Sequence, residues 1–310
     1  MNRLIAFGEV LEDYAFDNDK VIKLVGGAPL NFLCSASYFN SDCYIITCLS
    51  NDKGSSRVLS MMKKEGINLD YIKFDTSTIL CHSEVSVDKK TGEREFLFFK
   101  DNASFLSLKE EDIREEYFKN NDVFHFGTVC LLNDSIFKAQ EKAIKLAIKN
   151  NCLISFDPNF RATLFKENTQ KKLVCDFLPY VDILKLSIDE LNVLTNFNNE
   201  LENINELFDK YQNLKIIFLT EGSKGIDLYF RNRKVIHQDS IKPVKIIDTI
   251  GCGDCSYGAF ISSFMNDDCI NKDNIDKLND DIYKNALFKA CKVGSKICSI
   301  QGSLPIPDIN

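Results

Sequence analysis

Short apolar runs that alternate with helical patterns constrain the fold of this chain more than any other feature. Runs rich in β-branched and aromatic residues are typical of strands buried on both faces, at 3–7, 43–48, 123–127, 152–157, 181–186 and 215–220. Helical patterns separate or follow them, at about 29–39, 53–65, 134–150, 168–178, 187–195, 200–212, 253–266 and 280–299. Because strands alternating with helices form βαβ units, we predict an α/β fold with a mostly parallel sheet between helices. Ligands bind such sheets at the carboxyl ends of the strands.

One segment departs from this alternation. Residues 78–100 alternate apolar and polar side chains around the stretch "DKKTGER", which predicts a β-hairpin. A hairpin inside an α/β chain indicates a small β appendage of the kind that can form a lid.

Charge and hydropathy exclude several classes of protein. The formal net charge is −7 and no basic stripe occurs, so we expect no binding to nucleic acid or to a membrane surface. No apolar run approaches the roughly 18 residues that a membrane span needs. The N-terminus turns acidic after a few apolar positions and does not resemble a signal peptide. We therefore expect a soluble, cytoplasmic protein.

The 12 cysteines are scattered, several within apolar runs, which is typical of buried free thiols rather than of a disulfide framework. Cys252 and Cys255 are spaced C-x-x-C, as in a redox pair or half of a zinc site. Their place near the C-terminal end disfavours a thioredoxin-type site. The chain has no second C-x-x-C and no histidines at ligand spacing, which disfavours zinc.

The stretch "DTIGCGDC" (248–255) also fits an anion site. Gly251 and Gly253 let the backbone turn so that successive N–H groups point at one place, and the helix that follows adds partial positive charge. This arrangement predicts an anion hole with Asp254 at its rim, where a carboxylate can accept a proton from an attacking hydroxyl. The alternative is a capped helix start in which Asp254 only binds backbone N–H groups.

Two motifs near the N-terminus offer groups for a polyhydroxylated ligand. "VGGAPLNF" (25–32) permits close backbone approach and presents the amide of Asn31, although a Gly-Gly pair can simply form a tight turn. "GEVLEDY" (8–14) follows the first strand, and its carboxylates suit sugar hydroxyls or form a solvated acidic turn: Glu9, Glu12 and Asp13.

Two later motifs suit phosphate. "SFDPNFR" (155–161) ends with Arg161, whose guanidinium matches phosphoryl oxygens, or which forms a salt bridge with Asp157. "LTEGSKG" (219–225) is a second candidate phosphate cradle. The chain contains neither a Walker A sequence nor the Rossmann glycine motif after its first strand.

In their order along the chain, these motifs resemble those of the ribokinase-like (PfkB) carbohydrate kinases, most closely the fructokinase branch. "GGAPLN" is similar to the N-terminal signature of that branch, and the family's usual succession follows as "DPNFR", "VDILKLSIDEL", "LTEGSKG", "DTIGCGD" and "GSLPIP". The resemblance covers nearly the whole chain. It implies a three-layer ribokinase-like fold, one kinase domain over 1–310, a β lid formed by about 10–25 and 76–102, and a homodimer.

The resemblance also implies roles for single residues. Asp254 would be the catalytic base, and the phosphoryl group would be held by Arg161 and the N–H groups of Gly251, Cys252 and Gly253. The sugar would be bound by Asp13, Gly26, Gly27, Asn31 and Lys100. ATP and Mg²⁺ would lie among Lys185, Ser187, Glu190, Thr220, Gly222, Gly225 and Cys291. Glu190 would act on Mg²⁺ through water, and Asp248 and Thr249 would adjoin a monovalent cation, K⁺.

Several positions depart from the family pattern. Cys252 replaces the usual alanine of the anion hole, and we predict that oxidation or alkylation of its thiol blocks phosphate binding. Ser187 replaces a frequent asparagine of the metal motif, as in fructokinases. Cys291 replaces a frequent asparagine near the adenine site, and Lys100 stands where an arginine is common near the lid.

The sequence thus predicts an ATP-dependent kinase that phosphorylates a primary hydroxyl of a ketohexose, D-fructose in the first place. The alternatives are a kinase for another small acceptor, such as 2-keto-3-deoxygluconate, ribose or a nucleoside, and a catalytically idle sugar-binding relative. Retention of Asp254 and both glycines argues against the idle relative, because a binder needs no base.

Overall fold

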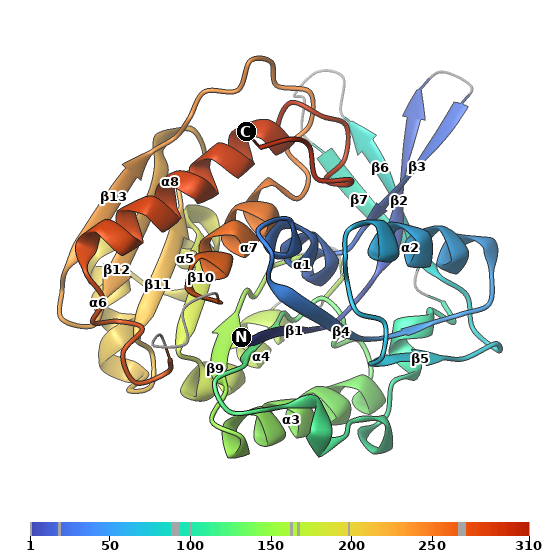
Figure 1. Ribbon diagram of the computed structural model, residues 1–310, viewed down its shortest axis with the longest axis horizontal. Helices are drawn as coiled ribbons and strands as arrows, with labels where there is room; N and C mark the ends of the chain where they lie inside the picture. The colour runs from blue at the N-terminus through green and yellow to red at the C-terminus, as the bar shows by residue number, and fades with distance from the viewer. Residues whose placement is uncertain are drawn as a thin grey trace.

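The computed structural model describes residues 2–17, 20–87, 94–99, 101–161, 164–165, 168–197, 199–265 and 271–309. Within these ranges, nine strands form the central sheet in the order β13-β12-β11-β10-β9-β8-β1-β4-β5 (Figure 1). They are β1 Arg3–Phe7, β4 Asp42–Leu49, β5 Ile72–Phe74, β8 Val123–Phe126, β9 Leu153–Phe156, β10 Ile183–Ser187, β11 Ile216–Thr220, β12 Gly225–Phe230 and β13 Val235–Asp239. All pairs are parallel except those of the β11-β12-β13 edge, so the predicted mostly parallel sheet is confirmed.

Helices cover both faces of this sheet and complete a three-layer fold (Figure 1). One apolar cluster joins the sheet to α1 Ala28–Tyr38, α2 Lys53–Lys64, α7 Cys252–Met265 and α8 Asp280–Ile297. A second cluster on the opposite face contains α3 Asp134–Lys149, α4 Thr169–Phe177, α5 Ile188–Leu194 and α6 Glu200–Lys210. Short 3₁₀ helices lie at Ser104–Ser107, Glu110–Asp112, Glu115–Tyr117, Leu178–Tyr180 and Gly222–Lys224. The six strands and eight helices that the sequence predicted outside the hairpin all lie within two residues of their expected bounds.

A separate four-stranded sheet has the order β3-β2-β6-β7. It consists of β2 Leu11–Asp17, β3 Lys20–Gly26, β6 Cys81–Val87 and β7 Arg94–Phe99. The antiparallel pairing of β6 with β7 confirms the predicted hairpin, and the parallel pairing of β2 with β6 joins it to the N-terminal strands. Lys100, predicted to bind the sugar, lies outside the described residues.

The acidic residues after β1 do not form a solvated turn, so that alternative was wrong. Glu9, Glu12 and Asp13 are all buried, and the last two belong to β2. Glu12 makes an ion pair of 2.5 Å with Arg57 of α2, and Asp13 accepts a hydrogen bond from Ser83 of β6. These two contacts replace the water that the carboxylates of Glu12 and Asp13 lose on burial.

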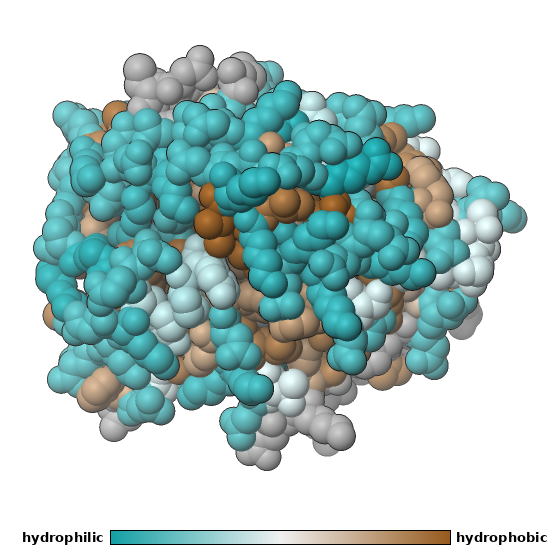
Figure 2. Space-filling model, turned by 90° about the horizontal axis from the view of Figure 1, so that it is seen from below, coloured by the Kyte–Doolittle hydropathy of each residue, from teal (hydrophilic) through white to brown (hydrophobic). Residues whose placement is uncertain are grey.

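The surface in Figure 2 is mainly hydrophilic, and apolar side chains show mostly near the middle of that face. None of the helices in the described segments combines the length and the apolar character that a membrane span requires. The cysteines in those segments are all free thiols, and eight of the eleven are buried, as the sequence predicted.

Candidate active site

Two cavities meet at the start of α7, beside residues that follow the carboxyl ends of the parallel strands. The first cavity has a volume of about 530 Å³ and is lined by Glu9, Leu11, Asp13, Gly27, Ala28, Asn31, Val129, Asn159, Arg161, Lys185, Ser187, Glu190, Thr249, Ile250, Gly251, Gly253 and Asp254. The second has a volume of about 450 Å³, and its lining includes Thr220, Gly222, Gly225, Thr249, Cys252, Gly253, Cys291 and Cys298. Thr249 and Gly253 line both cavities, so a ligand in one can reach a ligand in the other there.

Asp254 lies in the first turn of α7 and lines the first cavity. Asn31, in the first turn of the neighbouring helix α1, donates a hydrogen bond of 3.0 Å from Nδ2 to Oδ2 of Asp254. Its Oδ1 accepts a hydrogen bond of 2.7 Å from Ser303. The carboxylate of Asp254 therefore does more than cap a helix, because a side-chain amide held from two sides fixes its orientation.

The first turn of α7 offers unengaged N–H groups. The Cys252 N–H donates to the Thr249 carbonyl at 3.3 Å. The N–H groups of Gly253 and Asp254 have no acceptor among the residues that the structure describes. Gly251 has a φ of 71°, and a Cβ there would collide with Ser303. The glycine thus permits the turn that exposes the N-terminus of α7, which is suited to an anion.

The thiol of Cys252 does not lie where the sequence placed it. Cys252 and Asp254 are two residues apart on one helix, a rotation of about 200°, so their side chains leave α7 on opposite sides. Asp254 lines the first cavity and Cys252 the second, where its Sγ is 3.0 Å from Sγ of Cys298. Cys255 is buried, with its Sγ 3.6 Å from the Asn31 carbonyl oxygen. The prediction of a thiol inside the anion hole is therefore wrong.

Lys185 of β10 is the buried cation of the first cavity. Its Nζ lies 2.9 Å from Asp157 and 3.9 Å from Glu190. Burial opposes its charge, but these two carboxylates and Asp254 raise the pKa of Lys185 above its ordinary value. A Cβ on Gly253 would lie 3.6 Å from Nζ, which places the ammonium group beside the first turn of α7. Asp157, which the alternative interpretation paired with Arg161, forms its ion pair with Lys185.

Glu190 holds the start of α5 in place. Its Oε2 accepts from the Ser187 N–H at 2.8 Å, and Ser187 Oγ accepts in return from the Glu190 N–H at 3.2 Å, which is a capping box. Oε1 accepts from the Phe160 N–H at 2.9 Å. Burial opposes ionisation of Glu190, but Lys185 and the two N–H groups lower its pKa below the ordinary value. Both oxygens are already engaged, which suits contact with a metal through water rather than direct coordination.

Two further carboxyl groups that line the first cavity hold protons more tightly than usual. Burial raises the pKa of Glu9 to about 7; backbone N–H groups oppose the rise, and Asp254 adds to it. Burial also raises the pKa of Asp13 to about 6, against the hydrogen bond from Ser83. The first cavity can therefore present both ionised and protonated carboxyl groups near neutral pH, which suits hydroxyl groups that donate and accept.

The raised pKa of Glu9 predicts a pH-dependent stability effect. Folding raises this pKa from 4.5 to about 7, so the folded protein binds more protons than the unfolded chain between these values. The free energy of unfolding therefore falls as pH rises through this window. We expect Glu9→Gln to remove this decrease in the free energy of unfolding. The variant should be more stable than the wild type by about 3 kcal/mol above pH 7 and no more stable below pH 4.

Urea denaturation across this pH range measures the difference. Glu111→Gln is the matched control, because the side chain of Glu111 is 77% exposed and the variant reports only the exchange of a surface carboxylate for an amide. A Glu9→Gln gain that is equally large at acidic and alkaline pH would contradict the assignment.

Comparison with known proteins identifies the family. The pattern of the pfkB family carbohydrate kinases matches residues 1–307. This chain belongs to that family. Probable fructokinase-5 of Arabidopsis thaliana is 30% identical to it over 312 residues, which cover 97% of this chain and 93% of the relative.

Solved pfkB-type structures share the fold. A fructokinase of Xylella fastidiosa with bound ATP superimposes with a TM-score of 0.88 at 20% identity, over 98% of this chain and 94% of that chain. A double-mutant fructokinase of Vibrio cholerae O395 with bound fructose, ADP and potassium ion gives a TM-score of 0.86 at 23% identity, over 99% and 95%. The ribokinase-like three-layer fold with a small additional sheet is thereby confirmed.

Most site residues predicted for this pfkB kinase gather around the two cavities. The first holds Asp254, Gly251, Gly253, Arg161, Asp13, Gly27, Asn31, Lys185, Ser187, Glu190 and Thr249. The second holds Cys252, Thr220, Gly222, Gly225 and Cys291. Lys185, Ser187 and Glu190, which the resemblance assigned to ATP, thus line the same cavity as Asp254.

Two predicted residues line neither cavity. Gly26 packs against Asp13, and a Cβ on it would lie 2.8 Å from Asp13 Oδ2. Asp248 uses Oδ1 to accept from the Ile250 N–H at 2.8 Å and Oδ2 to accept from the Gly302 N–H at 3.1 Å. Asp248 therefore fixes the loop before α7 to the C-terminal segment, and the cation site beside it remains a prediction.

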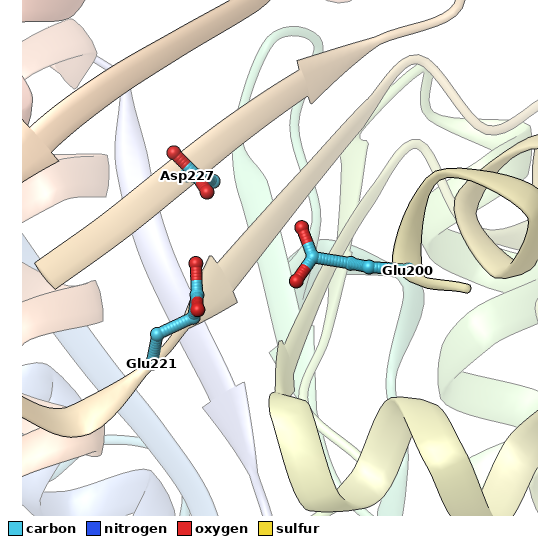
Figure 3. Close-up of side chains that lie close together, drawn as sticks. All are labelled: Glu200, Glu221 and Asp227. Carbon is cyan, nitrogen blue, oxygen red and sulfur yellow. The ribbon is translucent and has the colours of Figure 1, made fainter. Parts of the chain in front are cut away.

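A group of three carboxylates belongs to the lining of neither cavity. Glu200 comes from α6, Glu221 follows β11 and Asp227 lies in β12; their oxygens are within 4.8 Å of one another (Figure 3). Each already has a donor, since Tyr229 binds Glu200, Lys224 lies 3.2 Å from Glu221, and His237 lies 2.6 Å from Asp227. This cluster is satisfied by protein groups.

Three contacts that support the site join segments far apart in the sequence. Ser303 holds Asn31, Asp157 holds Lys185, and Cys298 faces Cys252. "GSLPIP" and "DPNFR" were recognised as motifs, but only the folded chain shows which member of each motif contacts the site. No local pattern marks Cys298.

Proposed function

We propose that this chain is an ATP-dependent fructokinase that transfers the γ-phosphoryl group to a primary hydroxyl of D-fructose. One observation carries the proposal: the sugar-sized cavity with Asp254 and the second cavity meet at Thr249 and Gly253, at the N-terminus of α7. The fructokinase names of the relatives support the acceptor. The bound ATP of one structural neighbour and the bound fructose and ADP of another support the two ligands.

The sugar would occupy the first cavity. Asp13 and Glu9 would bind its hydroxyl groups at one end, and Asn31 would orient both the sugar and Asp254. Asp254 would accept the proton of the attacking sugar hydroxyl while the hydroxyl oxygen bonds to the γ-phosphorus. The bond from that phosphorus to the bridging oxygen of ATP breaks, and ADP leaves with this oxygen. The small β-sheet supplies Leu11 and Asp13 to the cavity wall, and we propose that this sheet is the lid that excludes water.

The nucleotide would lie in the second cavity, with its terminal phosphate at the start of α7. Gly222 there has a φ of 58°, and no atom lies within 4 Å of a Cβ built on it, which leaves space for a ligand. The free N–H groups of Gly253 and Asp254, with Lys185 and Arg161, would stabilise the charge of the transferring phosphoryl group. Mg²⁺ would neutralise phosphate charge, with Glu190 acting through water.

An ATP-consumption screen tests this assignment. The acceptors are fructose, ribose, 2-keto-3-deoxygluconate and a nucleoside, each assayed with Mg²⁺ and again with excess chelator. We expect the highest kcat/KM with fructose and no turnover without Mg²⁺. A preference for another acceptor would contradict fructose as the substrate but would still support kinase activity. Binding of fructose and ADP without turnover on any acceptor would favour an idle sugar-binding relative.

A further inference from the structure

Two cysteines that are distant in sequence face each other in the wall of the second cavity. Cys252 is the first residue of α7, and Cys298 directly follows α8. Their Sγ atoms are 3.0 Å apart. A disulfide needs a separation of about 2.0 Å, so closure of the bond requires a movement of only about 1 Å.

Both thiols are accessible, unlike most cysteines here. In the described part of the chain, only Cys175, Cys252 and Cys298 are partly exposed, and the last two line the same cavity. A small oxidant that enters this cavity therefore meets both sulfur atoms together. The C-x-x-C partner Cys255 is fully buried and takes no part.

The pair also has suitable acid–base properties. The two thiols share a hydrogen bond in which either sulfur can donate, and this bond lowers the pKa of Cys298 to about 7 against the effect of burial. The same hydrogen bond, followed by burial, raises the pKa of Cys252. Cys298 thus supplies a thiolate near neutral pH, and the thiolate is the form that oxidants attack.

We propose that Cys252 and Cys298 form a reversible disulfide in the presence of a peroxide, and that this bond lowers the affinity of the second cavity for nucleotide. The Cys298 thiolate attacks one peroxide oxygen, the O–O bond breaks, and the departing hydroxide takes a proton to become water. The Cys252 sulfur then attacks the Cys298 sulfenic acid, the S–O bond breaks, and a second water leaves with the Cys252 proton. Two thiols lose two electrons and two protons, and a dithiol restores them by exchange.

The disulfide would act on the site through α7. Cys252 lies between Gly251 and Gly253, and the Cys298 carbonyl oxygen accepts from the N–H groups of Ile247 and Asp248 at 2.8 and 3.3 Å. A shift of either cysteine therefore moves the loop and the helix start that would hold the terminal phosphate. A displacement of about 1 Å at such a site can cost about 100-fold in activity. The effect on nucleotide rests on the function proposed above; the bond itself does not.

The test treats the protein with hydrogen peroxide and maps disulfides by mass spectrometry of peptides prepared without reductant. Calorimetry measures ADP affinity before oxidation, after it, and after dithiol treatment. Cys252→Ser and Cys298→Ser remove the pair, and Cys175→Ser is the matched control with another partly exposed cysteine; each variant is compared with its own reduced form. We expect a cross-linked Cys252–Cys298 peptide in the wild type and in Cys175→Ser, but in neither of the other variants. The same two proteins should show a reversible loss of ADP affinity of at least about tenfold. Bound ADP should slow formation of the bond.

Absence of the cross-linked peptide would overturn the disulfide. A cross-link without a change in ADP affinity would overturn its effect on the cavity, as would an equal loss of affinity in Cys298→Ser. If the reduced protein binds no ADP, both the proposed nucleotide site and its regulation by the disulfide are contradicted. Peptide mapping still shows whether the disulfide forms.

Discussion

Replacing Asp254 with asparagine is expected to lower kcat for sugar phosphorylation by about 10²- to 10⁴-fold, with little change in KM for the sugar. Asparagine keeps the shape of the side chain and one oxygen that can accept from Asn31, but it cannot take up the proton of the attacking hydroxyl. Because Asn31 donates to Asp254 from a helix packed against α7, we expect the variant to keep the fold. Steady-state rates of ADP release measure the effect.

Asp189→Asn is the matched control. Asp189 also lies in the first turn of a helix, α5, but it is exposed and lines neither cavity. Its replacement should leave kcat within about twofold, as for surface changes away from special features. Equal rates for Asp254→Asn and the wild type would remove Asp254 from the role of base. A large loss in both variants would point to a general effect of helix-terminal charge.

Replacing Lys185 with methionine is expected to lower the free energy of unfolding by about 3–5 kcal/mol. The side chain of Lys185 is 7% exposed, and its loss would leave Asp157 and Glu190 buried without their counter-charge. Asp157 can relieve part of this cost by taking up a proton, since burial already raises its pKa to about 7. The destabilisation should therefore be larger at alkaline than at acidic pH.

Urea denaturation of Lys185→Met at several pH values measures this effect. Lys149→Met is the matched control, because Lys149 pairs with Glu115 at 2.8 Å on the surface, where both side chains are more than half exposed. Such a pair contributes about 0–1 kcal/mol. If Lys185→Met does not fold, the double variant Asp157→Asn/Lys185→Met should regain much of the stability. A Lys185→Met loss no larger than that of Lys149→Met would contradict the buried ion pair.

Six of the nine strands of the central sheet could be predicted from the sequence because they are continuous apolar runs, and the helices between them were predicted from their own patterns. The apolar pattern did not predict β2, which only the resemblance implied as part of a β lid over about 10–25, because Glu12 and Asp13 interrupt that pattern. Their partners Arg57 and Ser83 come from segments far along the chain. The β12–β13 edge was missed for another reason. The glycines of "LTEGSKG" were interpreted as a candidate phosphate cradle, and Gly225 also begins a strand that pairs antiparallel with β11.

The site could be predicted as a set of motifs but not as two cavities. The predicted helix began at residue 253, and the observed one begins at Cys252. Asp254 lines the first cavity and Cys252 the second because their side chains leave α7 in different directions. The sequence does not show where the two cavities lie around this helix. The approach of Cys298 depends on how α8 packs on α7, so it could only be found in the folded structure.

Phosphorus NMR of a mixture of this protein, D-fructose, ATP and Mg²⁺ tests directly whether this chain is a fructokinase. We expect the ATP signals to be replaced by those of ADP and of one phosphate monoester, with proton–phosphorus coupling to the CH₂ group of a primary hydroxyl. The mixture with Asp254→Asn should keep its ATP over the same time. Release of inorganic phosphate without an ester, or unchanged ATP with a folded protein that binds both ligands, would contradict a fructokinase.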